Sequence, residues 1–288
     1  MNGKVVVITG ANVGIGKETA VGLAALGATT VLACRNQQKA EAARADIVER
    51  AGNDDVHLVT LDLADLASVR PAADEILTRW NRLDVLVNNA GGIWSPRATT
   101  KQGFEQTFGV NHLGHFLLTN LLLDRLKASA PSRIVNLSSV GHHYAVNGLD
   151  FADLQTEKRY SSMKAYSRSK LANILFTRGL ATRLEGTGVT TNAVHPGPVR
   201  SGFGMDGDMG GIMGLGNKVV RLFEISPAAG AKTSVYVASS PDLEATTGEY
   251  YARGRHGHMS RAARDAAAAD RLWEASEKLV ADAGFALA

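Results

Sequence analysis

Short apolar runs alternate with longer amphipathic stretches along this chain, and this alternation restricts its fold more than any other feature. The first run, residues 5–8, is a continuous β-branched stretch, typical of a strand buried on both faces. Strands are predicted at residues 5–8, 29–33, 56–61, 85–87, 133–137 and 189–194 and near Tyr250, and helices at residues 16–26, 38–51, 66–80, 104–128, 160–185, 227–238 and 261–281. This order predicts one α/β domain over residues 1–288, doubly wound around a parallel sheet of about seven strands with helices on both faces.

A glycine-rich turn joins the first predicted strand to the first helix. Gly10, Gly14 and Gly16 have the spacing G-x-x-x-G-x-G. Glycines at such a turn let the backbone approach a pyrophosphate, and the helix N-terminus adds free N–H groups and partial positive charge. A tight turn without a ligand is the alternative interpretation. The position of the turn in a βαβ unit favours a nucleotide.

The end of the second predicted strand indicates which nucleotide. An NAD-binding site usually places an acid there to bind the ribose 2′-hydroxyl. The run here is Val31-Leu32-Ala33-Cys34-Arg35-Asn36, which has no acid. Arg35 offers a fork of donors that suits a 2′-phosphate, and Lys17 is a second candidate cation. The sequence therefore favours NADP(H), with a solvated surface arginine as the alternative interpretation of Arg35.

Tyr166 and Lys170 are four residues apart, which places both on one face of a helix. A free phenol has a pKa near 10, and a nearby ammonium stabilises the phenolate and lowers that pKa. The pair predicts a general acid for carbonyl reduction or a general base for alcohol oxidation. Ser139 follows the fifth predicted strand and Asn88 to Gly91 end the fourth. These groups therefore converge at the carboxyl edge of the sheet, where ligands bind.

Together these motifs resemble the short-chain dehydrogenase/reductase family, and the resemblance covers roughly residues 4–201. The matching pieces are Thr9-Gly10-x-x-x-Gly14-x-Gly16, Asp62, Asn88-Asn89-Ala90-Gly91, Asn111, Ser139, Tyr166-x-x-x-Lys170 and Pro196-Gly197. Ala33-Cys34-Arg35-Asn36, Asn111 to Thr119 and Tyr166-Ser167-x-Ser169-Lys170-Leu171-Ala172-Asn173 resemble the retinol dehydrogenase and WW-domain oxidoreductase branch. The resemblance implies a Rossmann fold and NADP(H)-dependent hydride transfer on lipophilic aldehydes, ketones or alcohols.

The resemblance also implies roles for single residues. Tyr166 is the acid/base, Lys170 lowers its pKa and holds the nicotinamide ribose, Ser139 orients the substrate oxygen, and Asn111 supports a proton relay. Asp62 would contact the adenine amino group. The cofactor-binding residues implied are Gly10, Asn12, Val13, Gly14, Ile15, Gly16, Arg35, Asn36, Asp62, Leu63, Asn88, Ala90, Gly91, Tyr166, Lys170, Pro196, Gly197 and Val199.

The chain departs from the common family pattern on the substrate side. Ser139 and Tyr166 are 27 residues apart, and the additional stretch at residues 141–164 resembles an insert of the retinol-dehydrogenase-like branch. Residues 1–140 are expected to be mainly cofactor-binding, and residues 139–260 to form the catalytic and substrate side. A Gly- and Met-rich stretch within residues 202–226 predicts a flexible lid, with a functionless loop as the alternative.

Composition excludes several other classes of protein. The 31 basic and 28 acidic residues form no basic cluster, so we expect no nucleic-acid binding. Cys34 is the single cysteine and the histidines lack metal-ligand spacing, so we expect neither a disulfide nor a metal site. The chain shows no signal peptide and no apolar run of roughly 18 residues. We therefore expect a cytoplasmic protein without a membrane anchor.

Two other functions remain as alternatives. A non-catalytic NADP(H)-binding sensor or scaffold would share the fold, although such proteins tend to lose a catalytic residue. A nucleotide-sugar epimerase would share Y-x-x-x-K, but would show a G-x-x-G-x-x-G turn and a longer C-terminal region. The long predicted helices at residues 104–128 and 160–185 form the dimer interface in many relatives, so a homo-oligomer is a further expectation.

Overall fold

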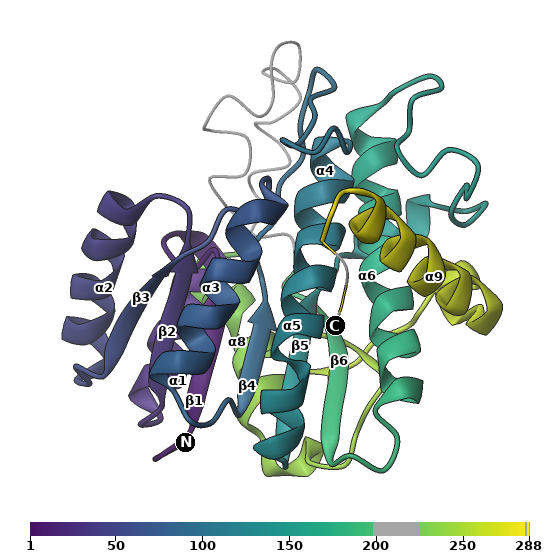
Figure 1. The fold of residues 1–288 in the computed structure, drawn as a ribbon. Helices are drawn as coiled ribbons and strands as arrows, with labels where there is room; N and C mark the ends of the chain where they lie inside the picture. The colour runs from purple at the N-terminus through teal and green to yellow at the C-terminus, as the bar shows by residue number, and fades with distance from the viewer. Residues whose placement is uncertain (198–224, 286, 288) are drawn as a thin grey trace.

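The computed structural model describes residues 1–197, 225–285 and 287. Its strands are β1 (Val5–Thr9), β2 (Thr29–Cys34), β3 (Val56–Thr60), β4 (Val85–Asn88), β5 (Ser132–Leu137), β6 (Val189–His195), β7 (Tyr250–Ala252) and β8 (Arg255–His256). Its main helices are α1 (Gly14–Ala25), α2 (Gln37–Ala51), α3 (Leu66–Arg79), α5 (Gly114–Ala128), α6 (Ser162–Arg183), α8 (Pro227–Ser239) and α9 (Ala266–Asp282). Helices and strands alternate along the chain as predicted, and Figure 1 shows the helices packed around one continuous sheet.

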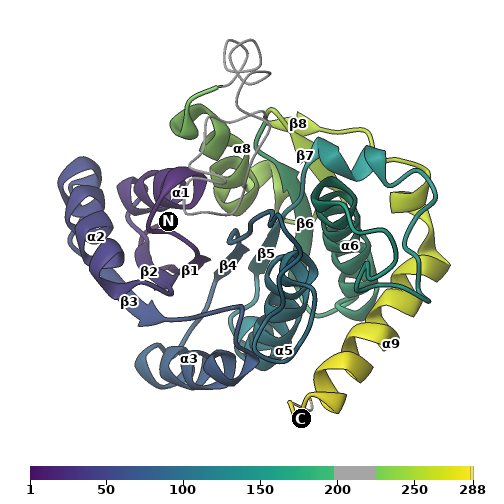
Figure 2. The same cartoon turned by 90° about the horizontal axis from the view of Figure 1, so that it is seen from above.

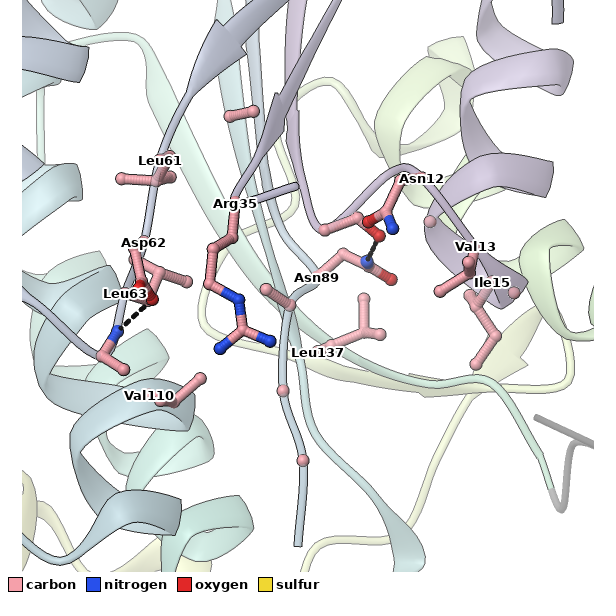
Figure 3. Close-up of a pocket in the computed structure, with 18 of the residues that line it drawn as sticks. Asn12, Val13, Ile15, Arg35, Leu61, Asp62, Leu63, Asn89, Val110 and Leu137 are labelled. Carbon is pink, nitrogen blue, oxygen red and sulfur yellow. Dashed lines mark hydrogen bonds between the residues drawn. The ribbon is translucent and has the colours of Figure 1, made fainter. Parts of the chain in front are cut away.

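The strands form one sheet in the order β3-β2-β1-β4-β5-β6-β7-β8. The strands from β1 to β7 pair in parallel, which confirms the predicted doubly wound sheet. Among the strands of the described residues, only β8 is antiparallel; its two residues are exposed and lack the apolar pattern that predicts a strand. The order reverses between β1 and β4, so their crossovers leave on opposite faces. Ligands bind at such a switch point, and a cleft opens there (Figure 3).

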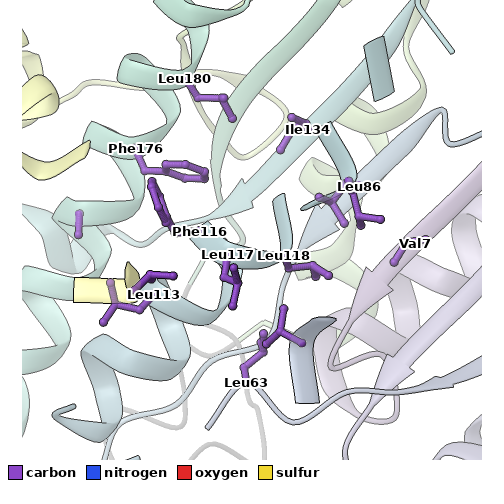
Figure 4. Close-up of a cluster of buried hydrophobic side chains, with 14 of the residues drawn as sticks. Val7, Leu63, Leu86, Leu113, Phe116, Leu117, Leu118, Ile134, Phe176 and Leu180 are labelled. Atoms are coloured by element: carbon purple, nitrogen blue, oxygen red, sulfur yellow. The ribbon is translucent and has the colours of Figure 1, made fainter. Parts of the chain in front are cut away.

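Helices cover both faces of the sheet, as Figure 2 shows from above. Side chains of β1 alternate between the faces: Val5 and Val7 enter the core under α3, α5, α6 and α9, whereas Val6 and Ile8 enter the core under α1, α2 and α8. All four are buried, because successive side chains of a strand point to opposite faces. Figure 4 shows the larger core, where Phe116 and Phe176 from neighbouring helices meet.

The predicted helix at residues 104–128 is interrupted. It consists of the short α4 (Gln106–Phe108), a π-helical turn η1 (Gly109–Leu113) and α5. A π turn inserts an extra residue in the helix and often occurs at a functional site. Asn111 lies within η1, so this irregularity sets where its side chain points.

Helix α9 packs onto α5 and α6, the two helices expected at an oligomer interface. The Trp273 ring lies 5.1 Å from the Phe116 ring and 5.8 Å from the Phe176 ring, between ring centres. A second copy approaching this face would therefore meet α9 as well, and the homo-oligomer stays a prediction. Of the expected lid at 202–226, the described residues include only Ile225 and Ser226. Among the helices in the described ranges, none combines the length and apolar character that crossing a bilayer requires.

Candidate active site

A cleft of about 360 Å³ lies at the carboxyl ends of β1, β2 and β4. It brings together most of the residues that the sequence singles out. The predicted residues that line it are Gly10, Asn12, Val13, Gly14, Ile15, Gly16, Arg35, Asn36, Asp62, Leu63, Ala90, Gly91, Tyr166, Lys170 and Pro196. The cleft therefore joins the glycine-rich turn at one end to the Tyr166–Lys170 pair at the other.

The glycine-rich turn is built so that its backbone stays accessible. A Cβ atom on Gly16 would lie 2.3 Å from Asn89 Nδ2 and 2.6 Å from the Gly10 carbonyl oxygen, so a side chain would displace this turn. The N-cap residue of α1, Val13, makes no side-chain hydrogen bond, and the first turn of α1 holds no acid. By contrast, Asn36 caps α2 and Asp65 caps α3. The first N–H groups of α1 are thus left for an anion, which fits a pyrophosphate.

Two cations face the cleft at the end of β2. Figure 3 shows the Arg35 guanidinium extended between Leu63 and Asn89. Lys39, in the first turn of α2, also lines the cleft. Lys17, the second cation expected from sequence, does not line it, because its ammonium pairs with Asp46 of α2 at 2.9 Å. The second basic residue at this end of the cleft is therefore Lys39.

The wall beyond Arg35 forms an apolar slot with one carboxylate. Leu61, Leu63 and Val110 line it beside Asp62 (Figure 3). One carboxylate oxygen of Asp62 accepts a hydrogen bond of 3.0 Å from the Ala64 amide, which holds the side chain in place. A flat heteroaromatic ring with an exocyclic amino group would suit this slot, as expected for adenine.

The loop after β4 forms the floor of the cleft. Asn89 anchors it by donating from Nδ2 to the Thr9 carbonyl oxygen at 2.7 Å. Ala90 and Gly91 line the cleft, but Asn88, which was expected along the cofactor, does not. Asn88 lies beneath the loop, where Nδ2 donates to Thr119 Oγ1 at 2.9 Å and to Asn136 Oδ1 at 2.8 Å. Its carboxamide therefore joins the buried strands instead of facing a ligand.

Tyr166, Ser139 and Lys170 meet at the far end of the cleft. The hydroxyls of Tyr166 and Ser139 share a hydrogen bond, which acts to lower the pKa of the phenol. Burial acts in the opposite direction and dominates, so the pKa of Tyr166 is raised above its usual value. This is opposite to the lowering by Lys170 that the sequence predicts. Burial also lowers the pKa of Lys170 to about 8, and its ammonium donates to the Leu137 carbonyl oxygen at 3.2 Å.

Of the two serines after β5, Ser139 is the one beside Tyr166. The Ser138 hydroxyl donates to the backbone oxygen of Lys170 at 2.7 Å, so it is occupied in joining β5 to α6. Ser138 nevertheless lines the cleft, whereas the surroundings of Ser139 are set by the 3₁₀ turn η2 (Val140–Tyr144). A Cβ atom on Gly141 would lie 3.1 Å from the Tyr166 ring, so η2 passes directly over the phenol.

Asn111 is fully buried and holds the next part of the floor. Its Oδ1 accepts from the Gly92 amide at 2.8 Å, and its Nδ2 donates to the Gly92 carbonyl at 3.0 Å and to Ser169 Oγ at 2.9 Å. Gly91 lies between Asn111 and Lys170: a Cβ atom there would be 2.8 Å from Asn111 Oδ1 and 3.4 Å from Lys170 Nζ. Of the four expected catalytic residues, Tyr166 and Lys170 line the cleft, whereas Asn111 and Ser139 lie next to them without lining it.

Several lining residues were not among the predicted site residues. The residues that line the cleft without having been predicted are Ala33, Lys39, Leu61, Ala64, Asn89, Gly92, Trp94, Gln106, Val110, Leu137 and Ser138. Trp94 packs its ring over Gly92, and the Tyr160 hydroxyl donates to the Trp94 backbone oxygen at 2.6 Å. Of the expected residues, Gly197 does not line the cleft and Val199 lies outside the described ranges.

The cysteine and histidines have other surroundings. Cys34 is buried, and burial raises the pKa of its thiol to about 11, so it is a packing residue. His142 is also buried: Nδ1 donates to the Ser139 carbonyl at 2.7 Å and Nε2 accepts from the Ser260 amide at 3.2 Å. Within the described ranges, no three His, Cys, Asp or Glu side chains form a group that could hold a metal ion.

Comparison with known proteins agrees with this site. A family model described as short chain dehydrogenase matches residues 4–151 and 152–208. Retinol dehydrogenase 12 from Homo sapiens is 49% identical over 278 residues, covering 96% of this chain and 86% of that protein. Retinol dehydrogenase 14 from Mus musculus is 48% identical over 291 residues, covering 97% of this chain and 86% of that protein.

Solved structures share the fold. An uncharacterized protein from Mycobacterium paratuberculosis has a TM-score of 0.79 and 36% identity, covering 100% of this chain and 96% of that one. At 24% identity, similar folds include a complex with NADH and a complex with NADP, with TM-scores of 0.68 and 0.69. With the matched family model and relatives, these findings confirm the resemblance seen in the sequence. The chain belongs to the short-chain dehydrogenase family, in its retinol-dehydrogenase-like branch, and is an oxidoreductase acting on CH–OH groups.

Proposed function

We propose that this protein is an NADP(H)-dependent oxidoreductase that interconverts a lipophilic alcohol and its aldehyde or ketone. One observation carries the proposal: a single cleft is lined by Arg35 at its nucleotide end and by Tyr166 and Lys170 at its reactive end. Binding of the dinucleotide across this cleft would bring the nicotinamide to the phenol. The nicotinamide, when bound, supplies or accepts the hydride.

The chain's own residues handle the proton and the substrate oxygen. In reduction, the Tyr166 hydroxyl donates its proton to the carbonyl oxygen, and in oxidation the phenolate takes the proton of the alcohol. Ser139, hydrogen-bonded to Tyr166, holds the same oxygen in line. Lys170 is close enough to stabilise the phenolate that reduction leaves behind. Asn111 fixes Gly92 and Ser169 around this corner, and so holds its shape.

The proposed preference for NADP(H) over NAD(H) is based on the positive charges at the end of β2. Arg35 and Lys39 both line the cleft there, and a 2′-phosphate requires such donors. The cleft residues next to them, Ala33 and Asn36, include no acid to bind a free 2′-hydroxyl. Asn36 is occupied as the cap of α2, accepting from the Lys39 amide at 2.9 Å.

The proposal of a lipophilic substrate is based on the side chains that line the cleft near Tyr166. Trp94 gives that part of the cleft apolar surface, and Gln106 adds one polar group. Such a lining favours a largely apolar molecule whose oxygen reaches Tyr166. The retinol dehydrogenases among the relatives act, by name, on a molecule of this kind.

Location and assembly stay predictions. We propose a cytoplasmic location because the single cysteine, Cys34, has a free and buried thiol, which suits a reducing compartment. A homo-oligomer is proposed on the family resemblance, with α9 as part of any contact through α5 and α6. Gel filtration with light scattering measures the mass in solution directly.

The proposal is tested by titrating NADPH and NADH separately into the purified protein and following fluorescence. We expect tight binding of NADPH and weak binding of NADH, with the difference levelled or reversed in Arg35→Asp. Equal binding of the two in the unaltered protein would contradict the assignment of Arg35.

Turnover is then measured over a panel of apolar aldehydes and ketones with NADPH. Reduction of members of the panel supports the proposed reaction. NADPH binding without reduction of any of them would favour the non-catalytic sensor, and turnover of a sugar nucleotide with tightly held NAD would favour the epimerase.

A further inference from the structure

His115 is a buried residue to which neither the resemblance nor the proposed chemistry assigns a role. It lies in the first turn of α5 with 2% of its surface exposed. Its Nε2 is 2.8 Å from Thr9 Oγ1 at the end of β1, and its Nδ1 is 3.2 Å from the Asn111 carbonyl oxygen. The ring thus touches both the strand that leads into the glycine-rich turn and a catalytic-site residue.

The donors and acceptors of this ring can be assigned from its partners. A carbonyl oxygen only accepts, so Nδ1 carries a proton and donates to Asn111. Burial lowers the pKa of His115 to about 4, so the ring is neutral and Nε2 is an acceptor. The Thr9 hydroxyl therefore donates to Nε2. Its lone pairs accept from the Asn89 amide at 2.9 Å and the Ala90 amide at 3.0 Å.

The two partners of His115 hold opposite ends of the same loop. Thr9 binds the amides of Asn89 and Ala90, where the loop begins. Asn111 binds both backbone groups of Gly92, where the loop turns toward Trp94. Residues 89–92 all line the cleft between its nucleotide end and its reactive end. A group that connects Thr9 to Asn111 therefore sets the position of this floor.

We infer that His115 is a positioning residue that ties Thr9 to Asn111 and so fixes the loop at residues 89–92 against the reacting groups. The effect of this tie on catalysis rests on the proposed function. Without the ring, the Thr9 hydroxyl still has the Val87 carbonyl oxygen within 3.4 Å, so the glycine-rich turn keeps its anchor. The bond between the ring and the Asn111 carbonyl, which joins the ring to the helical segment that carries Asn111, is lost with the ring. The loss falls on catalysis more than on cofactor binding.

The variant His115→Phe removes both nitrogens and keeps the ring volume. We expect kcat for carbonyl reduction to fall about tenfold, as for loss of hydrogen bonds that hold a reacting group. The Kd for NADPH should change by less than about threefold, because Arg35 and the glycine-rich turn are untouched. His115→Asn places an amide donor near the Nδ1 position and should recover part of kcat.

A matched control is His112→Phe. His112 is also buried on this helical segment, but its Nε2 bonds to Ser276 Oγ of α9 at 2.8 Å, away from the cleft. Thermal unfolding of both variants shows whether each is folded. Similar losses of stability with a kcat loss only in His115→Phe support the inference. An equal fall of kcat in both variants would overturn it.

Amide hydrogen exchange of the Gly92 region tests the tie without any turnover. We expect exchange about fivefold or more faster in His115→Phe than in the unaltered protein. Unchanged exchange would overturn the tie even if the enzyme is active. Faster exchange in a protein that reduces no carbonyl would keep the tie and reject the proposed function.

Discussion

The ammonium of Lys170 lies 5.7 Å from the centre of the Tyr166 ring, one helical turn away on α6. Both groups are held where their neutral forms are favoured, because burial raises the pKa of the phenol and lowers that of the ammonium to about 8. The phenol therefore keeps its proton near neutral pH in this structure. A carbonyl oxygen in the cleft would meet an acid ready to donate.

Tyr166→Phe removes the proposed proton donor and leaves the shape of the cleft nearly unchanged. We expect turnover to fall by about 10²–10⁴-fold, the usual contribution of a positioned acid. NADPH affinity should stay within about threefold, since the nucleotide end of the cleft is remote from the hydroxyl. Steady-state rates with one carbonyl substrate and a fluorescence titration check the two halves separately. Substantial remaining turnover would reject Tyr166 as the acid.

Lys170→Met should stabilise the folded protein while abolishing turnover. Burying the ammonium lowers its pKa from 10.5 to about 8, so the folded state bears a penalty for the charged form below pH 8. Removing the charge should raise the free energy of unfolding at pH 7 by about 1–3 kcal/mol, after loss of the bond to Leu137.

The difference in unfolding free energy between Lys170→Met and the unaltered protein depends on pH, as follows from linkage. Between about pH 8 and 10.5 the unfolded chain holds the Lys170 proton and the folded chain does not, so stability of the unaltered protein rises with pH there. The advantage of Lys170→Met should therefore be largest below pH 8 and shrink toward pH 10.5. Urea unfolding at a series of pH values measures it. A Met variant less stable than the original at pH 7 would contradict the cause assigned to this pKa.

The sequence predicts the sheet and the motif residues because both depend on local patterns. Val5 to Ile8 are apolar in unbroken succession, and Gly10 to Gly16 follow at once, so strand, turn and helix are apparent from neighbours in the chain. Asn88 shows the limit of this reasoning. It belongs to a matching motif, yet its side chain faces Thr119 and Asn136, which only the packed sheet brings near.

The identity of the second cation in the cleft and the position of the cleft wall at Trp94 depend on contacts between segments that are distant in the sequence. Lys17 follows the glycine-rich turn directly, but its ammonium forms an ion pair with Asp46 on the neighbouring helix. Trp94 reaches the cleft on an irregular segment whose position depends on Tyr160, far along the chain. Neither contact has a periodic or spacing signal, so both need the three-dimensional structure.

Lys39→Ala should weaken NADPH binding by about three- to tenfold and leave NADH binding nearly unchanged, because only NADPH carries the 2′-phosphate beside Arg35. Lys17→Ala is the matched control, since its ammonium is paired with Asp46 and does not line the cleft. Titrations of both nucleotides at two salt concentrations measure the effect. An equal loss for NADPH in the two variants would show that the charges act at long range and not as phosphate contacts.

Asp84→Asn should destabilise the protein without affecting the active site. Asp84 is 2% exposed and directly precedes β4, at the opposite end of the strand from the cleft. Burial raises the pKa of this carboxyl, but the hydrogen bonds from Arg82, Lys4 and the Val5 amide outweigh burial and hold the pKa below 3.8. Its stabilising contribution is present above pH 4 and is lost as pH falls through the folded pKa.

The expected loss for Asp84→Asn is about 2–3 kcal/mol at pH 7, less than for a fully buried pair because Arg82 and Lys4 are partly exposed. The loss should shrink as the pH approaches 2. Asp74→Asn, on the exposed surface of α3, is the control and should change stability by less than about 0.5 kcal/mol. Urea unfolding at pH 7 and pH 3 gives the comparison. In the folded variant, NADPH affinity should equal that of the original protein, because stability at the amino end of β4 and binding at its carboxyl end are separate properties of the strand.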